Sequence, residues 1–154
     1  MISFVIHNLE EAIWLPNWSK YAGKYHKPVQ TNEFLFAVII ITILGIILTF
    51  LTLIQSIEYI RIIYLGYVGM MVMNAVFPHL ILCIILKRYA PGLLSGLLLN
   101  VPIGLYILIS EIKYIDIKKI VISVIVVSMI TFSILPVLFR FGKTIEENMK
   151  IHNN

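Results

Sequence analysis

The sequence predicts an all-α membrane protein, a polytopic helix bundle with four transmembrane helices and a short or re-entrant helix at its N-terminus. The first observation is composition: 60% of the 154 residues are hydrophobic, whereas a soluble domain contains about 45–50%. The second is that the apolar residues form runs of about 20, the length of helix that crosses a hydrocarbon core. The third is that these runs lack the strict alternation of a strand. Together they predict one membrane domain over residues 1–154.

The first predicted element covers residues 1–18, an apolar segment interrupted by a few polar residues. Trp14 and Trp18 are typical of a membrane interface, and a basic connection over residues 19–32, expected to be cytoplasmic, follows them. At about 1.5 Å per residue, such a helix would barely span the bilayer. Three arrangements therefore stay open: a short spanning helix, a helix that dips in from the cytoplasmic side, and an amphipathic helix on the membrane surface.

Residues 33–140 are predicted to contain the four transmembrane helices. The connections between them are short and polar, which makes neighbouring helices antiparallel. The predicted spans are Phe34–Ile54, Ile62–Leu86, Leu93–Ile109 and Ile120–Phe139. Residues 141–154 are expected to be a polar cytoplasmic tail with a short helix of its own, in which Glu146 and Lys150 would pair at i,i+4 spacing.

Lysine and arginine predict the orientation of the bundle. Four of the 12 basic residues lie on one side of the four predicted spans: Arg61, Lys113, Lys118 and Lys119. The other eight lie on the opposite side: Lys20, Lys24, Lys27, Lys87, Arg88, Arg140, Lys143 and Lys150. Because cytoplasmic loops carry the excess of positive charge, we expect a multi-pass protein of the cell membrane with a cytoplasmic C-terminus. The net charge of +4 therefore reflects membrane topology, and no nucleic acid partner is expected.

Small residues and prolines predict how the helices pack. Small residues at four-residue steps let two helix backbones approach closely, and the third span carries such a ridge: Gly92, Gly96, Asn100 and Gly104. Three prolines lie within predicted helices and predict kinks: Pro78, Pro102 and Pro136. A straight helix would place Asn74 and His79 about 140° apart. A kink at Pro78 would turn both toward one cavity.

The residues with the clearest potential for chemistry are His7, Glu10 and Glu11. Their i, i+3, i+4 spacing places them on one helix face. An imidazole beside two carboxylates suits a divalent metal, zinc or iron, or an acid/base cluster. In an apolar segment the pattern is more telling than on a soluble helix, because ionisable groups within a membrane need partners.

A second polar group is expected to meet this one. His79 lies about 12 Å along its helix from Lys87, and Asn100 lies about 13 Å from Pro91, at the other end of the same connection. Both should therefore lie in one layer of the cytoplasmic leaflet, near Asn74. The alternative is that His79 and Asn100 form only interhelical hydrogen bonds. If His7 and His79 share a metal, their side-chain nitrogens should lie roughly 3–5 Å apart.

Three further residues are expected to have no role in the site. Cys83 is the single cysteine, which excludes a disulfide framework and a multi-cysteine metal site, and it is expected to be a small buried side chain. His26 and His152 lie outside the apolar segments and are expected to be solvated or interfacial.

Three stretches of the chain resemble a known family. They are His7-Asn8-Leu9-Glu10-Glu11, Asn74 to His79, and Arg88-Tyr89-Ala90-Pro91-Gly92. The chain is similar in these stretches to the HXXEE-motif membrane proteins, which are small and mostly bacterial, and the resemblance extends over nearly the whole chain. It implies a membrane fold and a role for His7, Glu10 and Glu11, and it implies no particular reaction.

Three functions are compatible with these residues. The first is a membrane-embedded metal-dependent enzyme for a lipophilic small molecule, with metal ligands from His7, Glu10, Glu11 and His79. Glu10 and Glu11 would be its catalytic residues, and Asn74 and Asn100 would orient a ligand or the substrate. The second is a binding or transport protein for a cation or an amphiphile, which would need to form a homodimer. The third is a purely structural polar layer. A protease is disfavoured, because no HExxH motif or serine elbow is present.

Overall fold

The computed structural model describes the backbone of residues 1–24 and 27–152, and it leaves out the side chains of residue 146 and residues 148–152. The predicted Glu146–Lys150 pair and the expected positions of His26 and His152 therefore fall outside the described residues. Every regular element in the described part is helical. The elements are α1 (Ile2–Trp18), η1 (Ser19–Ala22), α2 (Thr31–Ile54), α3 (Glu58–Asn74), η2 (Ala75–Leu80), α4 (Ile81–Leu86), α5 (Leu93–Ser95), η3 (Gly96–Asn100), α6 (Val101–Glu111) and α7 (Ile117–His152).

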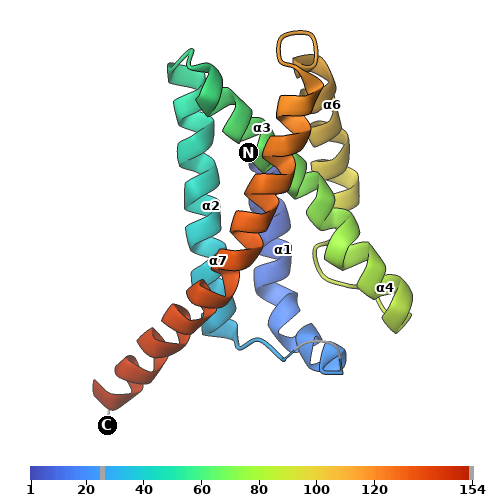
Figure 1. Cartoon of the computed structure of the whole chain (residues 1–154). Coiled ribbons are helices and arrows are strands. Elements are labelled where there is room, and N and C mark those ends of the chain that lie inside the picture. The colour runs from blue at the N-terminus through green and yellow to red at the C-terminus, as the bar shows by residue number, and fades with distance from the viewer. Residues whose placement is uncertain (25–26, 153–154) are drawn as a thin grey trace.

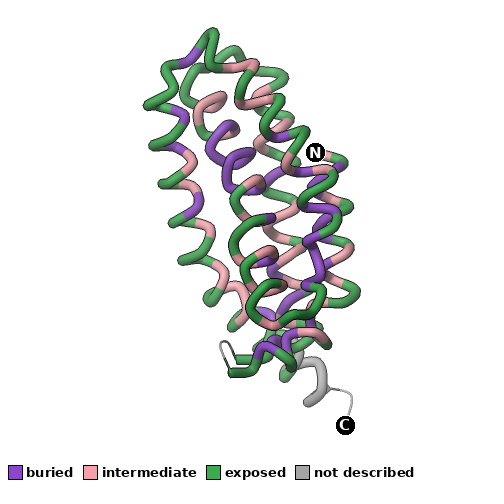
Figure 2. The backbone as a smooth tube through the Cα atoms, turned by 90° about the vertical axis from the view of Figure 1, so that its right-hand side faces the viewer, coloured by how far each residue is buried: buried purple, intermediate pink, exposed green. Residues whose placement is uncertain are grey.

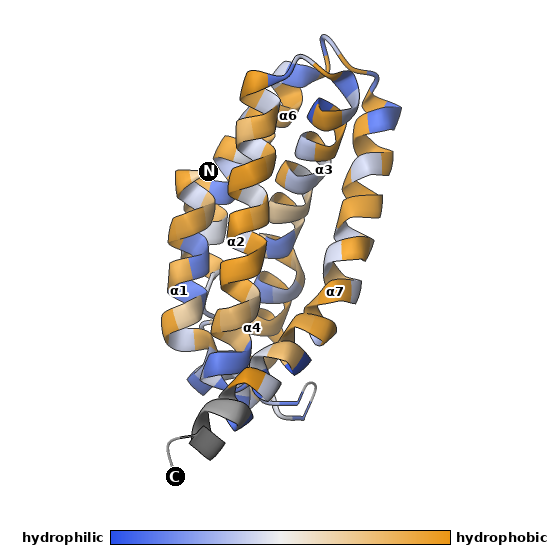
Figure 3. Ribbon diagram, turned by 90° about the vertical axis from the view of Figure 1, so that its left-hand side faces the viewer, coloured by the Kyte–Doolittle hydropathy of each residue, from blue (hydrophilic) through white to orange (hydrophobic). Residues whose placement is uncertain are grey.

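Four helical stretches of the described chain are long and apolar enough to cross a membrane. They are Thr31–Ile54, Glu58–Leu86, Leu93–Glu111 and Ile117–Ile145. Their outer surfaces are apolar, with Leu53 78% and Tyr106 76% exposed in the isolated chain, and hydrophobic colour dominates the outside of the bundle (Figure 3). Lipid tails cover such surfaces in a bilayer. The prediction of an all-α membrane bundle is confirmed.

The helices alternate in direction, as the short connections predicted. The α2–α3 and α6–α7 connections lie at one end of the bundle, and the ends of α1 and α4 lie at the other, beside the start of α2 (Figure 1). The helix α1 packs against α2, α5 and η3. Because Phe4, His7 and Glu11 on this helix are buried, α1 is part of the bundle, which favours the spanning and dipping arrangements over a helix on the membrane surface. Figure 2 shows the buried residues along the centre of the molecule.

The tail was predicted to be helical, and it is. It forms no separate short helix, because α7 runs from Ile117 to His152 as one element. Close packing against the start of α2 explains the continuation. A Cβ atom on Gly142 would lie 2.9 Å from the Cα atom of Glu33, so the glycine lets the two backbones approach there. An i,i+4 ion pair, Lys143 Nζ to Glu147 Oε1 at 3.7 Å, follows one turn later.

The three prolines have different effects. Pro78 lies in η2, a widened π-helical turn in which the backbone of Phe77 is extended (φ −124°, ψ 116°). Pro102 lies in the first turn of α6, directly after the second widened turn, η3. Pro136 lies inside α7, which continues through it as one helix that changes direction along its length (Figure 1). Widened turns of this kind are frequent at functional sites.

The predicted ridge of small residues faces protein. All four of its members are buried: Gly92, Gly96, Asn100 and Gly104. A Cβ atom on Gly96 would lie 2.9 Å from the Cβ atom of Ala75, and one on Gly104 would lie 2.4 Å from Cγ2 of Val72. This close approach brings η3 and α6 against α3 and η2.

Candidate metal centre

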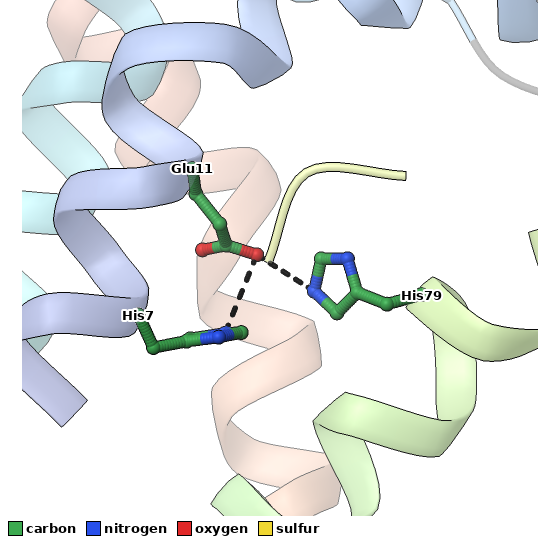
Figure 4. A group of neighbouring side chains, drawn as sticks. All are labelled: His7, Glu11 and His79. Carbon is green, nitrogen blue, oxygen red and sulfur yellow. Dashed lines mark ion pairs between the residues drawn. The ribbon is translucent and has the colours of Figure 1, made fainter. Parts of the chain in front are cut away.

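Three side chains from two separate elements meet in the interior. His7 and Glu11 lie one turn apart on α1, and His79 comes from η2 (Figure 4). Glu11 Oε1 lies 2.7 Å from His79 Nε2 and 3.6 Å from His7 Nε2. The three potential ligand atoms all lie within 4.8 Å of one another, which agrees with the spacing predicted for the two imidazoles. His7 is fully buried, and His79 and Glu11 are 3% and 9% exposed.

The widened turn η2 is what brings His79 to this position. The extended backbone at Phe77 and the missing N–H group of Pro78 interrupt the regular helix between Asn74 and His79. As a result, the side chain of Asn74 reaches both imidazoles: its Nδ2 atom lies 3.3 Å from His79 Nε2 and 3.1 Å from His7 Nε2. The two imidazole rings meet edge to face, with their centroids 5.3 Å apart. The predicted effect of Pro78 on Asn74 and His79 is thus found.

A chain of hydrogen bonds orients the ring of His7. Ser95 Oγ donates to Glu10 Oε2 and lies 3.2 Å from His7 Nδ1, from which it can accept. The tautomer with its proton on Nδ1 would have a lone pair on Nε2. This nitrogen lies near Asn74, Glu11 and His79. Metal-binding histidines are commonly held in this way, with the other ring nitrogen donating to an oxygen.

The same groups can form hydrogen bonds or bind a cation. Asn74 Nδ2 lies 3.1 Å from His7 Nε2 and can donate to it, and an N–H on His79 Nε2 can donate to Glu11 Oε1 at 2.7 Å. Two imidazole nitrogens and a carboxylate oxygen are also ligand types that bind divalent metals, and they lie within 4.8 Å of one another. The donor set therefore fits a metal ion, which would replace some of these contacts.

Glu10 is adjacent in sequence but points elsewhere. Its Oε1 atom accepts from the Gly92 backbone N–H at 2.8 Å and from the Tyr89 hydroxyl. Its Oε2 atom accepts from the Ser95 backbone N–H at 3.1 Å and from the Ser95 hydroxyl. The structure therefore does not bring Glu10 into the group of predicted metal ligands. Its carboxylate instead ties α1 to the 87–92 connection and holds His7 through Ser95.

Gly92 allows this connection to pass beside the three ligands. Its φ of +89° is unfavourable for residues with a side chain. A Cβ atom on Gly92 would also lie 2.9 Å from Cε1 of both His7 and His79, and 3.0 Å from Cγ of Glu11. Glycine is therefore required here for conformation and for space.

Tyr89 and Ser95 are the residues that spacing alone did not assign to the site. Burial, followed by the hydrogen bond to Glu10, raises the pKa of Tyr89 to about 12, so its hydroxyl remains a donor at neutral pH. Tyr89 also accepts from the backbone N–H of Leu94 at 3.2 Å. The sequence offered one signal for Ser95. It directly precedes Gly96, which belongs to the ridge of small residues that was predicted to face protein.

Asn100 is buried but lies apart from these contacts. It is 1% exposed, and neither its Nδ2 nor its Oδ1 atom has a hydrogen-bond partner within the described part of the chain. The structure thus confirms that Asn100 faces protein without bringing its amide into contact with the three ligands. Its predicted role in orienting a ligand or substrate stays a prediction.

A largely apolar cavity of about 280 Å³ adjoins the centre. Glu11, Asn74 and His79 form part of its wall, and the rest comes mainly from apolar residues of α1, α2, α4 and α7. No lysine or arginine lies among the described residues that line it. The centre is therefore open to an apolar molecule from within the bundle.

Comparison with known proteins agrees with the motif at the site. Residues 1–107 match the family described as "protein of unknown function with HXXEE motif". The chain belongs to the HXXEE family. The motif that gives the family its name is His7 to Glu11, and the matched residues also include His79 and Ser95. Every side chain of the candidate centre in this HXXEE protein therefore lies within the family match.

One relative is a curated protein of Bacillus subtilis (strain 168), "Uncharacterized protein YrkK". It is 46% identical to this HXXEE protein over 103 residues, which cover 66% of this chain and 65% of the relative. The match thus spans slightly less than two thirds of the relative's length. No solved structure matches the chain.

Proposed function

We propose that this protein is a membrane-embedded metal-dependent enzyme that acts on a lipophilic substrate. The observation that carries the proposal is the convergence of His7 Nε2, His79 Nε2 and Glu11 Oε1 within 4.8 Å inside a membrane helix bundle. Buried ionisable groups in a membrane protein mark functional sites more often than structural ones. The adjoining apolar cavity supports a substrate drawn from the bilayer.

His7, His79 and Glu11 would hold the ion. Two imidazoles and one carboxylate form a ligand set found for catalytic zinc and for non-haem ferrous iron, both of which leave a coordination position open. A bound ion of this kind supplies a Lewis acid and lowers the pKa of bound water. Asn74 lies within hydrogen-bond distance of both imidazoles and would orient one of them or the substrate.

The two glutamates would have different roles. Both recorded contacts of Glu11 to the imidazoles use Oε1, and the residue borders the cavity. Its second oxygen would accept a proton from the attacking group. Glu10 would act indirectly, because its oxygens accept hydrogen bonds from Tyr89, Gly92 and Ser95. It would keep Ser95, and through it His7, in the orientation that binds the ion.

The orientation in the membrane is part of the proposal. The 87–92 connection, the end of α1 and the C-terminal half of α7 lie at the same end of the bundle (Figure 1), and these segments carry Lys87, Arg88 and Lys143. By the positive-inside rule this end would face the cytoplasm, with the C-terminus on that side. A reporter fused to the C-terminus that is active only in the cytoplasm tests this, and an inactive fusion at normal expression would reverse the topology.

Metal analysis of the purified chain tests the proposed centre. The full chain is purified in detergent without added metal, and bound zinc and iron are measured per chain. We expect about one ion per chain in the wild type and its loss in Glu11→Gln and His79→Ala. Glu58→Gln, which changes an exposed carboxylate on α3, is the matched control and should keep the ion.

The outcomes separate the candidate functions. An ion that remains in Glu11→Gln and His79→Ala would show that it binds elsewhere and would overturn the proposed centre. A wild-type chain that binds no zinc or iron, even after incubation with either, but that binds an amphiphile, would favour the alternative of a binding or transport protein without catalysis. In that case a homodimer becomes the expected assembly, and cross-linking in membranes would test it.

A further inference from the structure

The cavity beside the candidate centre is lined by one continuous face of α1. The lining residues on this helix are Phe4, Asn8, Glu11, Leu15 and Trp18, and their spacing alternates between four and three residues. Side chains at this spacing lie above one another on a single helix face. Glu11 and Trp18 are seven residues apart, or about 10 Å along the helix axis. The cavity therefore follows α1 from the metal ligands to the membrane-interface end of the helix.

Trp18 presents an unused hydrogen-bond donor at that end. Its Nε1 atom is buried and has no acceptor among the described residues, although an indole N–H can only donate. Buried polar atoms of native proteins nearly always have a partner. The neighbouring hydroxyl of Ser19 does not serve as its acceptor in this structure; it donates to the Pro16 carbonyl and accepts from the Val29 N–H. Trp18 lines the cavity, so an acceptor on a molecule within the cavity would complete this donor.

The electrostatics of the cavity define that acceptor further. A carboxylate buried here would lack a cation, since no lysine or arginine is found among the described lining residues, and an unpaired buried charge is strongly unfavourable. A neutral carbonyl oxygen needs only one donor.

We propose that the cavity binds a neutral acyl amphiphile of the bilayer, with its carbonyl oxygen on Trp18 Nε1 and its apolar chain along α1 to Glu11 and His79. This inference rests on the proposed function for the reaction. It adds the class of substrate. In this binding mode the metal ligands meet the substrate about 10 Å from its carbonyl group, part-way along its hydrocarbon chain. The height of Trp18 at the interface matches the level at which lipid carbonyls lie in a membrane.

Photolabelling with three probes of equal chain length tests this binding mode. The probes are a methyl hexadecanoate, a hexadecanoic acid and a hexadecane, each with a photoreactive diazirine in mid-chain, applied to the full chain in lipid nanodiscs. We expect the ester to label cavity residues such as Leu135 and Phe139, and excess unlabelled ester to suppress that labelling. Labelling at lipid-facing Leu53 should be equal for all probes and should not be suppressed.

Two tryptophan variants isolate the proposed hydrogen bond. In Trp18→Phe, cavity labelling by the ester should fall about fivefold, to the level of the hexadecane probe, as expected for one lost hydrogen bond. Trp14→Phe is the matched control, because Trp14 is 55% exposed, and it should label like the wild type. Leu135→Trp, which would narrow the cavity, should abolish the suppressible labelling for every probe.

The results distinguish this inference from the metal proposal. Equal cavity labelling by ester and hexadecane in the wild type, or preferential labelling by the acid, would overturn the carbonyl assignment. Labelling that excess ester does not suppress would overturn the binding site itself. The same labelling experiment on Glu11→Gln separates the two proposals. If this variant keeps the wild-type labelling pattern and the wild type binds no metal, the proposed ligand stands and the proposed enzyme does not.

Discussion

The two ends of the bundle use charged residues in different ways. At the end with the α2–α3 and α6–α7 connections, two glutamates each meet one permanent cation: Glu111 Oε2 lies 2.6 Å from Arg61 Nε, and Glu58 Oε1 lies 2.6 Å from Lys119 Nζ. Glu58 and Lys119 are more than half exposed. In each such pair the two charges neutralise each other, and exposed pairs contribute little to the free energy of folding.

In the interior near the other end, the carboxylates of Glu10 and Glu11 are held without any contact to lysine or arginine among the described residues. Glu10 accepts from neutral hydroxyl and amide donors, and Glu11 faces two imidazoles in a buried site. The first arrangement pairs each carboxylate with a cation, whereas the second gathers two imidazoles and a carboxylate whose possible ligand atoms lie within 4.8 Å of one another. The outer pairs join helices, and the inner group has the composition that the proposed metal ion requires. The predictions below test this difference.

The largest effect is expected for Gly92→Ala. The alanine must adopt an unfavourable positive φ and would place a Cβ atom 2.9 Å from both imidazoles, so the 87–92 connection has to move away from the ligands. A residue with a side chain in such a conformation costs about 1–3 kcal/mol, and the displaced histidines should lose the metal. Thermal unfolding in detergent and metal content per chain measure both effects.

The control for this variant is Gly23→Ala. Gly23 has a φ of −56°, and a Cβ atom added there would come closest to the Lys20 carbonyl oxygen, at 3.3 Å. It should therefore unfold close to the wild type and keep its metal. A Gly92→Ala protein with wild-type stability and metal content would show that the connection is not held against the ligands.

The next largest effect is expected for Ser95→Ala. This change removes both the acceptor for His7 Nδ1 and one donor to Glu10, while the three metal ligands stay. Loss of such a supporting hydrogen bond typically weakens metal binding about 10–100-fold. Competition with a metal chelator of known affinity measures the change. Ser110→Ala is the control, because its hydroxyl bonds only to the Ile107 carbonyl of its own helix; an equal effect in both variants would contradict the role of Ser95.

The sequence predicted the bundle well because lipid imposes simple requirements. Runs of about 20 apolar residues gave four spans whose positions agree with the structure. The glycine ridge gave the buried face of η3 and α6, since only small residues permit a Cβ approach such as 2.4 Å at Gly104. The helical tail was predicted, but its continuity with the last span was not, because the packing partner that supports it, the start of α2, is known only from the tertiary structure.

The candidate centre was predictable in part. The i,i+4 spacing of His7 and Glu11 and the kink at Pro78 are local features, so they indicated which side chains would meet. The separation of Glu10 from Glu11 was not predictable, because adjacent residues on a helix point about 100° apart and only the tertiary structure shows what each one meets. Ser95 and Tyr89 reach Glu10 across more than 75 intervening positions, a distance that no local pattern encodes.

A smaller effect is expected for Tyr89→Phe. It removes one of the donors to Glu10 and leaves the Gly92 and Ser95 donors in place. Metal affinity should fall about fivefold, the effect of one hydrogen bond. The pKa of Tyr89 is raised to about 12, above the ordinary value near 10. The hydrogen bond therefore contributes fully below about pH 10 and is lost as the pH rises through about 12.

Chelator competition at pH 7 and at pH 9 tests this pH dependence. The ratio between wild type and Tyr89→Phe should be the same at both values, because Tyr89 keeps its proton at each. A ratio that shrinks toward 1 at pH 9 would mean that the hydroxyl ionises in this range and that the Glu10 contact is not as the structure has it.

The smallest effect is expected for Arg61→Met at the opposite end. Arg61 pairs with Glu111 and lies over the Tyr114 ring at 5.3 Å, and its side chain is 41% exposed. An exposed pair of this kind contributes about 0.2–1 kcal/mol, and salt at about 1 M should screen most of it. The unfolding midpoint in detergent should therefore drop slightly at low salt and approach the wild type at high salt, with unchanged metal content. A loss of metal in Arg61→Met would show that the two ends of the bundle are coupled. The outer ion pairs would then help to hold the metal ligands in position.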